Sequence, residues 1–286
     1  MPLWTPASRR SYVVDNWGAN PSATPGVSVT PGASSAEGSW TDSGLGTLAQ
    51  EVSCILVRVS DGNASGVARN HFLDIGVDPA GGTSYVPIIS DLVCGSSGTV
   101  AFTGSGRRYF FPIRIPSGAT VGFRIQGSDA TAGTVRVGIR AYGQQSHPWL
   151  QPVGQYSETI GAGASTLGTS FTPGNAADGS WASLGTTTRE CWWWQLGYQL
   201  DNTVMTAEYT YIELAYGDAS NKHVILRLLH GATATGAGAE GIGEIMDAHL
   251  IEGYWRVPAG SNLYVRGRCN NAPDTGYNAA AVGIGG

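Results

Sequence analysis

Lysine is almost missing from this chain of 286 residues: Lys222 is the only one, and arginines make up the rest of the Lys and Arg total. Charged residues make up only 13% of the chain, and the formal net charge is −5. The arginines are spread along the sequence and form no basic stripe of the kind that neutralises phosphates. We therefore expect no nucleic-acid partner.

Long apolar runs are missing too. No stretch of about 18 apolar residues occurs, so the sequence predicts no membrane-spanning helix and no membrane partner. Residues 1–6 lack the charged start and apolar run of a signal peptide, and classical secretion is therefore not expected.

Cysteine is scarce, and its spacing argues against disulfides. Cys54 and Cys94 lie 40 residues apart, whereas Cys191 and Cys269 lie 78 apart. A bridge shared by two repeats would keep its spacing, so buried free thiols are expected. Without a CxxC pair or a Cys/His cluster, the sequence predicts no metal site and no cofactor.

What the chain has in abundance is glycine, with 42 residues, together with a 42% share of hydrophobic residues that is too high for disorder. Helical patterns are scarce, and β-branched or alternating segments at 53–59, 108–115 and 134–142 predict strands. Six to eight short strands in each half of the chain indicate an all-β protein built of β-sandwiches, with jelly-roll topology preferred.

An internal repeat divides the chain. The segment Gly38–Trp40 returns as Gly179–Trp181 at a shift of 141 residues, and Ile115–Gly118 resembles Val257–Gly260 at a shift of 142. Such landmarks in the same order predict a tandem duplication. The expected organisation is an N-terminal arm, a first β-sandwich repeat, a linker and a second β-sandwich repeat, at residues 1–11, 12–143, 144–155 and 156–286.

Two pairs of residues mark matching positions in the repeats. Trp40 and Trp181 are expected to fill the same structural pocket in each domain. Asp74 and Glu213 are matched carboxylates flanked by apolar residues. Because glycoside hydrolysis needs two carboxylates about 5–10 Å apart and neither has an obvious partner, we expect both to bind loop backbone.

The run Trp192, Trp193 and Trp194 belongs to the second repeat alone. In a strand the first and third indoles share one face, and the second takes the other. One interpretation is packing against the first repeat or a neighbouring subunit. The other is a sugar-stacking platform that also includes Tyr254 and Trp255.

Motifs of catalysis are missing. No GxSxG elbow, HExxH pair or dinucleotide-binding loop in a βαβ setting occurs. We therefore predict a non-enzymatic protein without catalytic residues. A polysaccharide depolymerase is the enzymatic alternative.

Several segments together carry a resemblance: TPG before GSW, then LDIGVDPAGG, FPIRIPSG and VRVGIRAYG. This series resembles small glycine-rich virion proteins of tailed bacteriophages, most closely over residues 26–143. The second repeat departs from it, with ELAYGDA and VPAG at the matching places. The resemblance implies a structural protein that decorates the head or forms part of a tail fibre, spike or tail tip.

The resemblance also sets expectations for location and partners. The chain would be made in the host cytoplasm and reside in the virion, bound to other virion proteins and to copies of itself, with a trimer expected by analogy. The arm, carrying Trp4, Arg9 and Arg10, would anchor it. The alternative function is a carbohydrate-binding module that recognises a host surface glycan.

Overall fold

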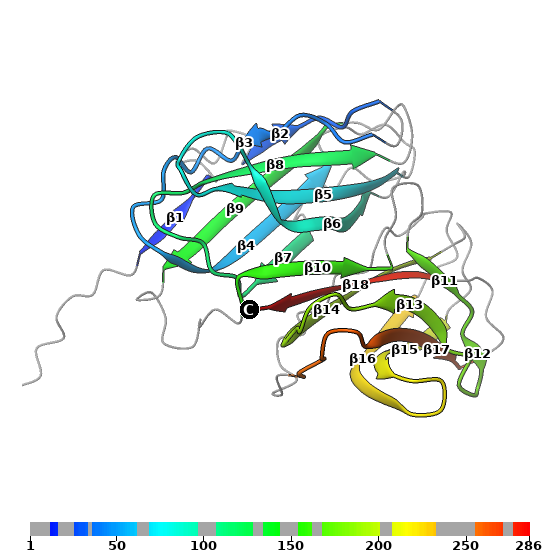
Figure 1. Ribbon diagram of the computed structural model, residues 1–286. Helices are drawn as coiled ribbons and strands as arrows, with labels where there is room; N and C mark the ends of the chain where they lie inside the picture. Colours follow the sequence, from blue (N-terminus) through cyan, green and yellow to red (C-terminus); the bar gives the residue numbers. More distant parts are fainter. Residues whose placement is uncertain are drawn as a thin grey trace, which may run out of the picture.

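The computed structural model describes residues 12–16, 26–33, 36–61, 69–96, 107–127, 134–143, 154–161, 168–200, 208–232, 255–270 and 277–286. Over these ranges the chain forms strands and turns without any helix, which confirms the all-β prediction (Figure 1). It follows that no helix of the described part could cross a membrane. The arm with Trp4, Arg9 and Arg10 lies outside these residues, as do Tyr254 and most of the predicted linker.

The first half of the chain forms two antiparallel sheets. Sheet 1 has the order β1-β9-β4-β7, with β2 also paired to β9, and sheet 2 has the order β3-β8-β5-β6. The strands are β1 (Val13–Asp15), β2 (Val27–Val29), β3 (Thr41–Asp42), β4 (Val52–Asp61), β5 (Arg69–Asp78), β6 (Val86–Ser96), β7 (Arg107–Phe111), β8 (Thr120–Gly127) and β9 (Val135–Gly143).

The second half forms two further sheets. In sheet 3, β18 pairs with β10, β11 and β14; sheet 4 has the order β12-β17-β15-β16, with β13 also on β17. The strands are β10 (Tyr156–Ile160), β11 (Thr169–Phe171), β12 (Gly174–Asn175), β13 (Ala182–Thr186), β14 (Trp193–Leu200), β15 (Glu208–Gly217), β16 (Lys222–Ala232), β17 (Asn262–Cys269) and β18 (Tyr277–Gly285).

The pairing scheme of the first half returns in the second. Strands β9, β4, β8, β5 and β6 correspond in order and partners to β18, β14, β17, β15 and β16. Each sheet takes strands from both ends of its half, an order typical of jelly rolls. No counterpart of β7 occurs among the residues that the structure describes. The isolated bridge between Val52 and Ile115 likewise has its counterpart between Cys191 and Val257.

Local chemistry explains features of strands β9 and β6. Residues of β9 alternate between a buried apolar face and arginines, as expected for a strand with one covered face. Pro87 lies in β6, an edge strand whose register shifts next to it, the position that a proline without an amide donor requires. Residues 255–257 form no strand, and Val257 makes only an isolated bridge with Cys191.

Strand β18 of sheet 3 is buried on both faces and joins the two halves. Odd-numbered β18 residues such as Ala279 and Ala281 face the core of the second half, whereas Val282 and Ile284 belong to the core cluster of the first. At the same junction the amide of Arg114 donates to the Gly154 carbonyl at 2.9 Å. The two sandwiches therefore share apolar packing.

The outer edge of the first half also meets the second half. Strand β10 runs beside β6 (Figure 1), where the Ser157 hydroxyl donates to the Ile88 carbonyl at 2.6 Å and Thr159 donates to Ser90. Hydroxyl side chains thus satisfy carbonyls that an edge strand would otherwise leave unpaired.

Candidate functional site

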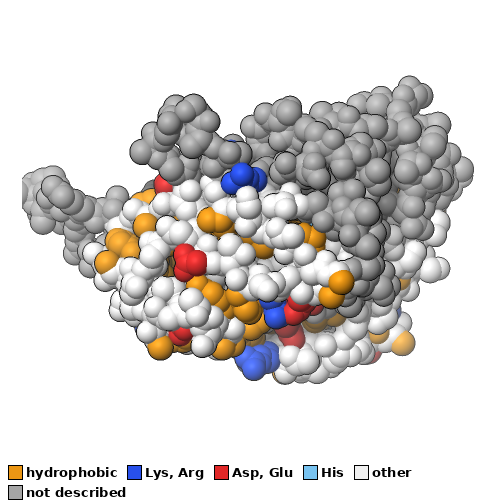
Figure 2. Space-filling view, turned by 90° about the horizontal axis from the view of Figure 1, so that it is seen from above, with side chains coloured by type: hydrophobic (Ala, Val, Ile, Leu, Met, Phe, Trp, Pro, Cys, Tyr) orange, Lys and Arg blue, Asp and Glu red, His pale blue; other side chains and the backbone are white. Residues whose placement is uncertain are grey.

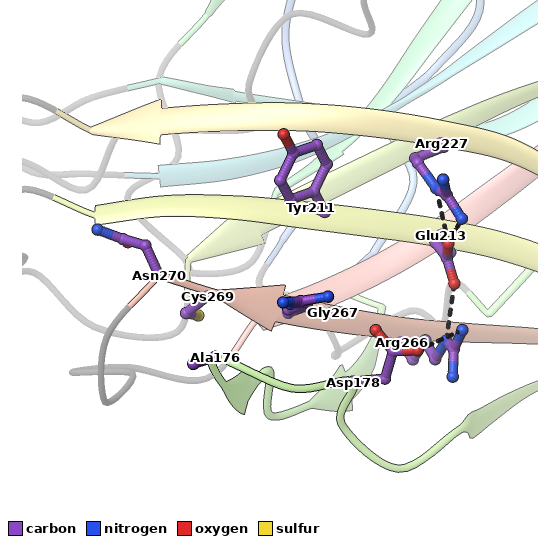
Figure 3. Close-up of a pocket in the computed structure, with 10 residues that line it drawn as sticks. Ala176, Asp178, Tyr211, Glu213, Arg227, Arg266, Gly267, Cys269 and Asn270 are labelled. Atoms are coloured by element: carbon purple, nitrogen blue, oxygen red, sulfur yellow. Dashed lines mark hydrogen bonds and ion pairs between the residues drawn. The ribbon is translucent and has the colours of Figure 1, made fainter.

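A carboxylate between two arginines occupies the outer face of sheet 4. Glu213, on β15, lies directly across from Arg227 on β16 and Arg266 on β17. The Nε atoms of the two arginines donate to the two carboxylate oxygens of Glu213, each at 2.7 Å (Figure 3). Three adjacent strands therefore position a row of alternating charge.

The row rests on an aromatic support. The Arg266 guanidinium lies 4.3 Å from the ring centroid of Trp181 and forms a second ion pair with Asp178 at 2.8 Å. Burial raises the pKa of Glu213, but hydrogen bonds and charges from Arg266 and Arg227 outweigh this, so its pKa is lowered. Glu213 is thus held as a carboxylate, and a proton donor in catalysis would need the opposite shift.

The first half holds a similar stack at the matching positions. Arg124, on β8, donates from Nε to Asp74 at 2.8 Å, pairs with Glu37 at 2.5 Å and lies 4.7 Å from the Trp40 ring centroid. The tryptophan fits because Gly76 leaves room: a Cβ there would stand 2.6 Å from the indole. The repeated unit is therefore a tryptophan that supports an arginine bound to two carboxylates.

These contacts specify the surroundings of the landmark residues. Trp40 and Trp181 are partly buried, and each supports an arginine at the matching place of its half. Asp74 does accept a backbone amide, from Asp91 at 2.7 Å, but that residue lies within β6 at a register shift and not in a loop. Glu213 binds arginines instead, because β16 places Arg227 where β6 has this irregularity.

The sequence contains a signal for this stack in the spacing of its two arginines. Arg124 and Arg266 are 142 residues apart, and the same shift relates the segment Ile115–Gly118 to the segment Val257–Gly260. Each is directly across from the matched carboxylate in its half. Cross-strand neighbours of opposite charge are the pairs that a sheet places in contact.

Beside the Glu213 row, the outer face of sheet 4 is hollowed into a recess of about 680 Å³. A second cross-strand row borders it, in which Tyr211 on β15 lies between Leu229 on β16 and Arg268 on β17. The lining residues are Ala176, Asp178, Tyr211, Glu213, Arg227, Arg266, Gly267, Arg268, Cys269 and Asn270 (Figure 3).

The two halves differ in the solvent exposure of this second row. In the first half the matching pair is Phe72 and Gln126, also directly opposed, and both are almost fully buried. In the second half Tyr211 is 48% exposed and Arg268 is exposed. The surface that the first half covers is open in the second.

The tryptophan run is divided among three environments. The Trp193 ring contacts Phe111 of the first half at 6.2 Å between centroids, whereas Trp194 is buried in the second core. Trp192 precedes β14, so the expected sharing of one strand face with Trp194 does not apply; it carries the Arg256 guanidinium at 5.3 Å. Trp255 is 43% exposed.

The four cysteines are free and buried, and burial raises the pKa of Cys54 to about 12. Within the described ranges no group of three or more His, Cys, Asp or Glu side chains could hold a metal ion.

Comparison with known proteins adds little. Neither a protein-family model nor a curated protein matches this chain. Tripeptidyl peptidase 2 is similar at 7% identity and a TM-score of 0.25, with 96% of this chain covering 23% of that one. N-glycanase F (PNGase F) is similar at 11% identity and a TM-score of 0.28, with 96% of each chain covered. Scores this low carry no inference about this protein.

Proposed function

We propose that this chain is a non-enzymatic structural component of a tailed-bacteriophage particle. The observation that carries the proposal is the junction between the halves, where Trp193, Val282 and Ile284 join the core of the first sandwich. A double sandwich with shared packing suits a rigid building block better than two domains on a flexible linker would.

The surface supports a role in assembly. Charged side chains are few on the face shown in Figure 2, where a mixed group of basic and acidic side chains lies toward the lower edge and uncharged side chains cover most of the rest. Large apolar side chains are exposed at places outside the lining of the recess, namely Val13, Val86 and Trp255. Low charge and exposed apolar residues favour burial against other subunits, with the trimer still expected by analogy.

A non-enzymatic role is supported by the state of the acidic groups. The carboxylates of both stacks are bound to arginines, and the lowered pKa of Glu213 is unsuited to general acid catalysis. The choice of a phage particle as the assembly rests on the sequence resemblance to phage virion proteins.

The test is a cryo-EM reconstruction of the purified particle, with mass spectrometry to identify the chain. Density for a double sandwich on the head lattice would support a decoration protein, and density on fibres or tail tip an adsorption component. A chain that is absent from purified particles would overturn the proposal. Deletion of residues 1–11 is expected to abolish incorporation while leaving the isolated protein folded.

A further inference from the structure

We infer that the recess on the outer face of sheet 4 is a binding site for a carboxylated sugar, a class that includes uronic acids in acidic glycans. The inference does not depend on the proposed particle role. It rests on Arg268, Tyr211 and the paired charges around them.

Arg268 supplies the positive charge that recognises the ligand. It is exposed at the recess, and no acidic partner for it occurs within the described ranges. Arg227 and Arg266, by contrast, are already bound to Glu213. A planar guanidinium with free donors binds a carboxylate through two parallel hydrogen bonds.

Tyr211 supplies the apolar surface. Its side chain is directly across from Arg268 on the same face of the sheet and is 48% exposed. An aromatic ring of this kind can stack on the apolar face of a pyranose, while its hydroxyl remains available for hydrogen bonding. An arginine and an aromatic ring side by side therefore match a sugar ring that carries a carboxylate.

The charge balance of the recess favours a singly charged ligand. Its lining has three arginines against two carboxylates, Glu213 and Asp178. Glu213 is buried beneath its arginines, whereas Asp178 is 47% exposed and can accept hydrogen bonds from sugar hydroxyls. A polyphosphate would meet these two negative charges, which makes it the poorer fit.

The size of the recess and its restriction to one half also support a site. A volume of about 680 Å³ lies within the usual range of small-molecule pockets. The matching positions of the first half, Phe72 and Gln126, are covered. The fold alone therefore does not require an exposed tyrosine and arginine here.

The test is isothermal titration calorimetry of the full chain with a tetrasaccharide of alternating glucuronate and N-acetylglucosamine. A tetrasaccharide of N-acetylglucosamine alone is the neutral comparison. We expect saturable binding of the acidic probe with a Kd below about 1 mM, and binding of the neutral probe at least about tenfold weaker.

Variants assign the binding to the recess. Arg268→Gln and Tyr211→Ala are each expected to weaken binding about tenfold or more, whereas Tyr211→Phe keeps the ring and most of the affinity. Arg114→Gln is the matched control, because it removes one charge from a 46% exposed arginine of the first half. All four variants should melt near the wild-type temperature.

Several outcomes would overturn the inference: equal affinity for both tetrasaccharides, no effect of Arg268→Gln, or no saturable binding of the acidic probe. Tighter binding of a poly-glutamate peptide would assign the recess to an acidic protein partner instead. Displacement of the sugar by equimolar inorganic phosphate would mark a general anion site. None of these results bears on whether the chain is present in the particle, which is measured separately.

Discussion

The two halves of the molecule use one strand arrangement for two purposes. On the outer face of sheet 2, Asp74 and Arg124 lie beside a covered pair, Phe72 and Gln126. On the outer face of sheet 4, Glu213 and its arginines lie beside an open recess. Both halves therefore carry the charged stack on one strand arrangement, whereas the neighbouring row is covered in one half and open in the other.

A second contrast lies in the cores. In the first half Ile55 is directly across from Ala141 on β9. At the matching place in the second half Trp194 is across from Gly283 on β18, and a Cβ on that glycine would stand 2.7 Å from the indole. The absence of a methyl group on Gly283 leaves room for the indole and offsets part of the larger side-chain volume on β14.

The largest expected effect concerns the junction that makes the halves one body. Trp193→Ala removes the contact with Phe111 and should lower the free energy of unfolding by about 2–4 kcal/mol. We expect urea unfolding, monitored by tryptophan fluorescence, to show one transition in the wild-type protein and two in this variant. Trp255→Ala, which removes an exposed indole, is the control. Equal unfolding curves for the two variants would show that the halves do not depend on this contact.

Next in size is the Trp194 and Gly283 pair. Gly283→Ala should destabilise the protein by about 1–3 kcal/mol, because the added methyl group meets the indole. The double variant Gly283→Ala with Trp194→Ile recreates the pair of the first half and should recover part of the loss in a thermal melt. If the double variant is less stable than Gly283→Ala alone, volume balance is not the reason for the difference.

The Glu213 stack predicts a dependence on acid. The pKa of Glu213 is lowered on folding, so its contribution is present above the unfolded pKa and is lost as the pH falls through the folded one. Glu213→Gln should lower stability at pH 7 by about 1–3 kcal/mol and flatten the loss of stability below about pH 4. Chemical denaturation from pH 7 to pH 3 measures both. An unchanged slope in the variant would assign the acid sensitivity to other carboxylates.

The smallest effect is expected for the outer arginine of that stack. Arg227 is 62% exposed, so Arg227→Ala should cost less than about 1 kcal/mol. Arg266 is 22% exposed and contacts Trp181, Asp178 and Glu213, so Arg266→Ala should cost more. Urea denaturation of both variants at low and high salt measures this, and the reverse order would contradict the contacts described.

The sequence predicted the fold class because alternation and turn residues report directly on half-buried strands. It did not mark β1, β2, β10 and β11 as strands, since these are short pieces in segments rich in glycine, serine and threonine whose pairing comes from distant partners. Matched shifts identified Asp74 and Glu213, but their arginine partners depend on strand register. The recess depends on the solvent exposure of the second cross-strand row, which differs between the halves although their strand arrangement is the same.

The contact of β10 with β6 has a direction. Strand β10 corresponds to β1 of the first half, and β6 corresponds to β16 of the second. The two halves thus meet through different surfaces, one through β6 and the other through the counterpart of β1. Across the described ranges β1 makes no comparable contact with β16. A two-fold dimer would use both such edges at once, whereas this head-to-tail joint leaves the edge of β16 at one end and β1 at the other. The pair of sandwiches therefore has two different ends, as does a segment of a head-to-tail assembly.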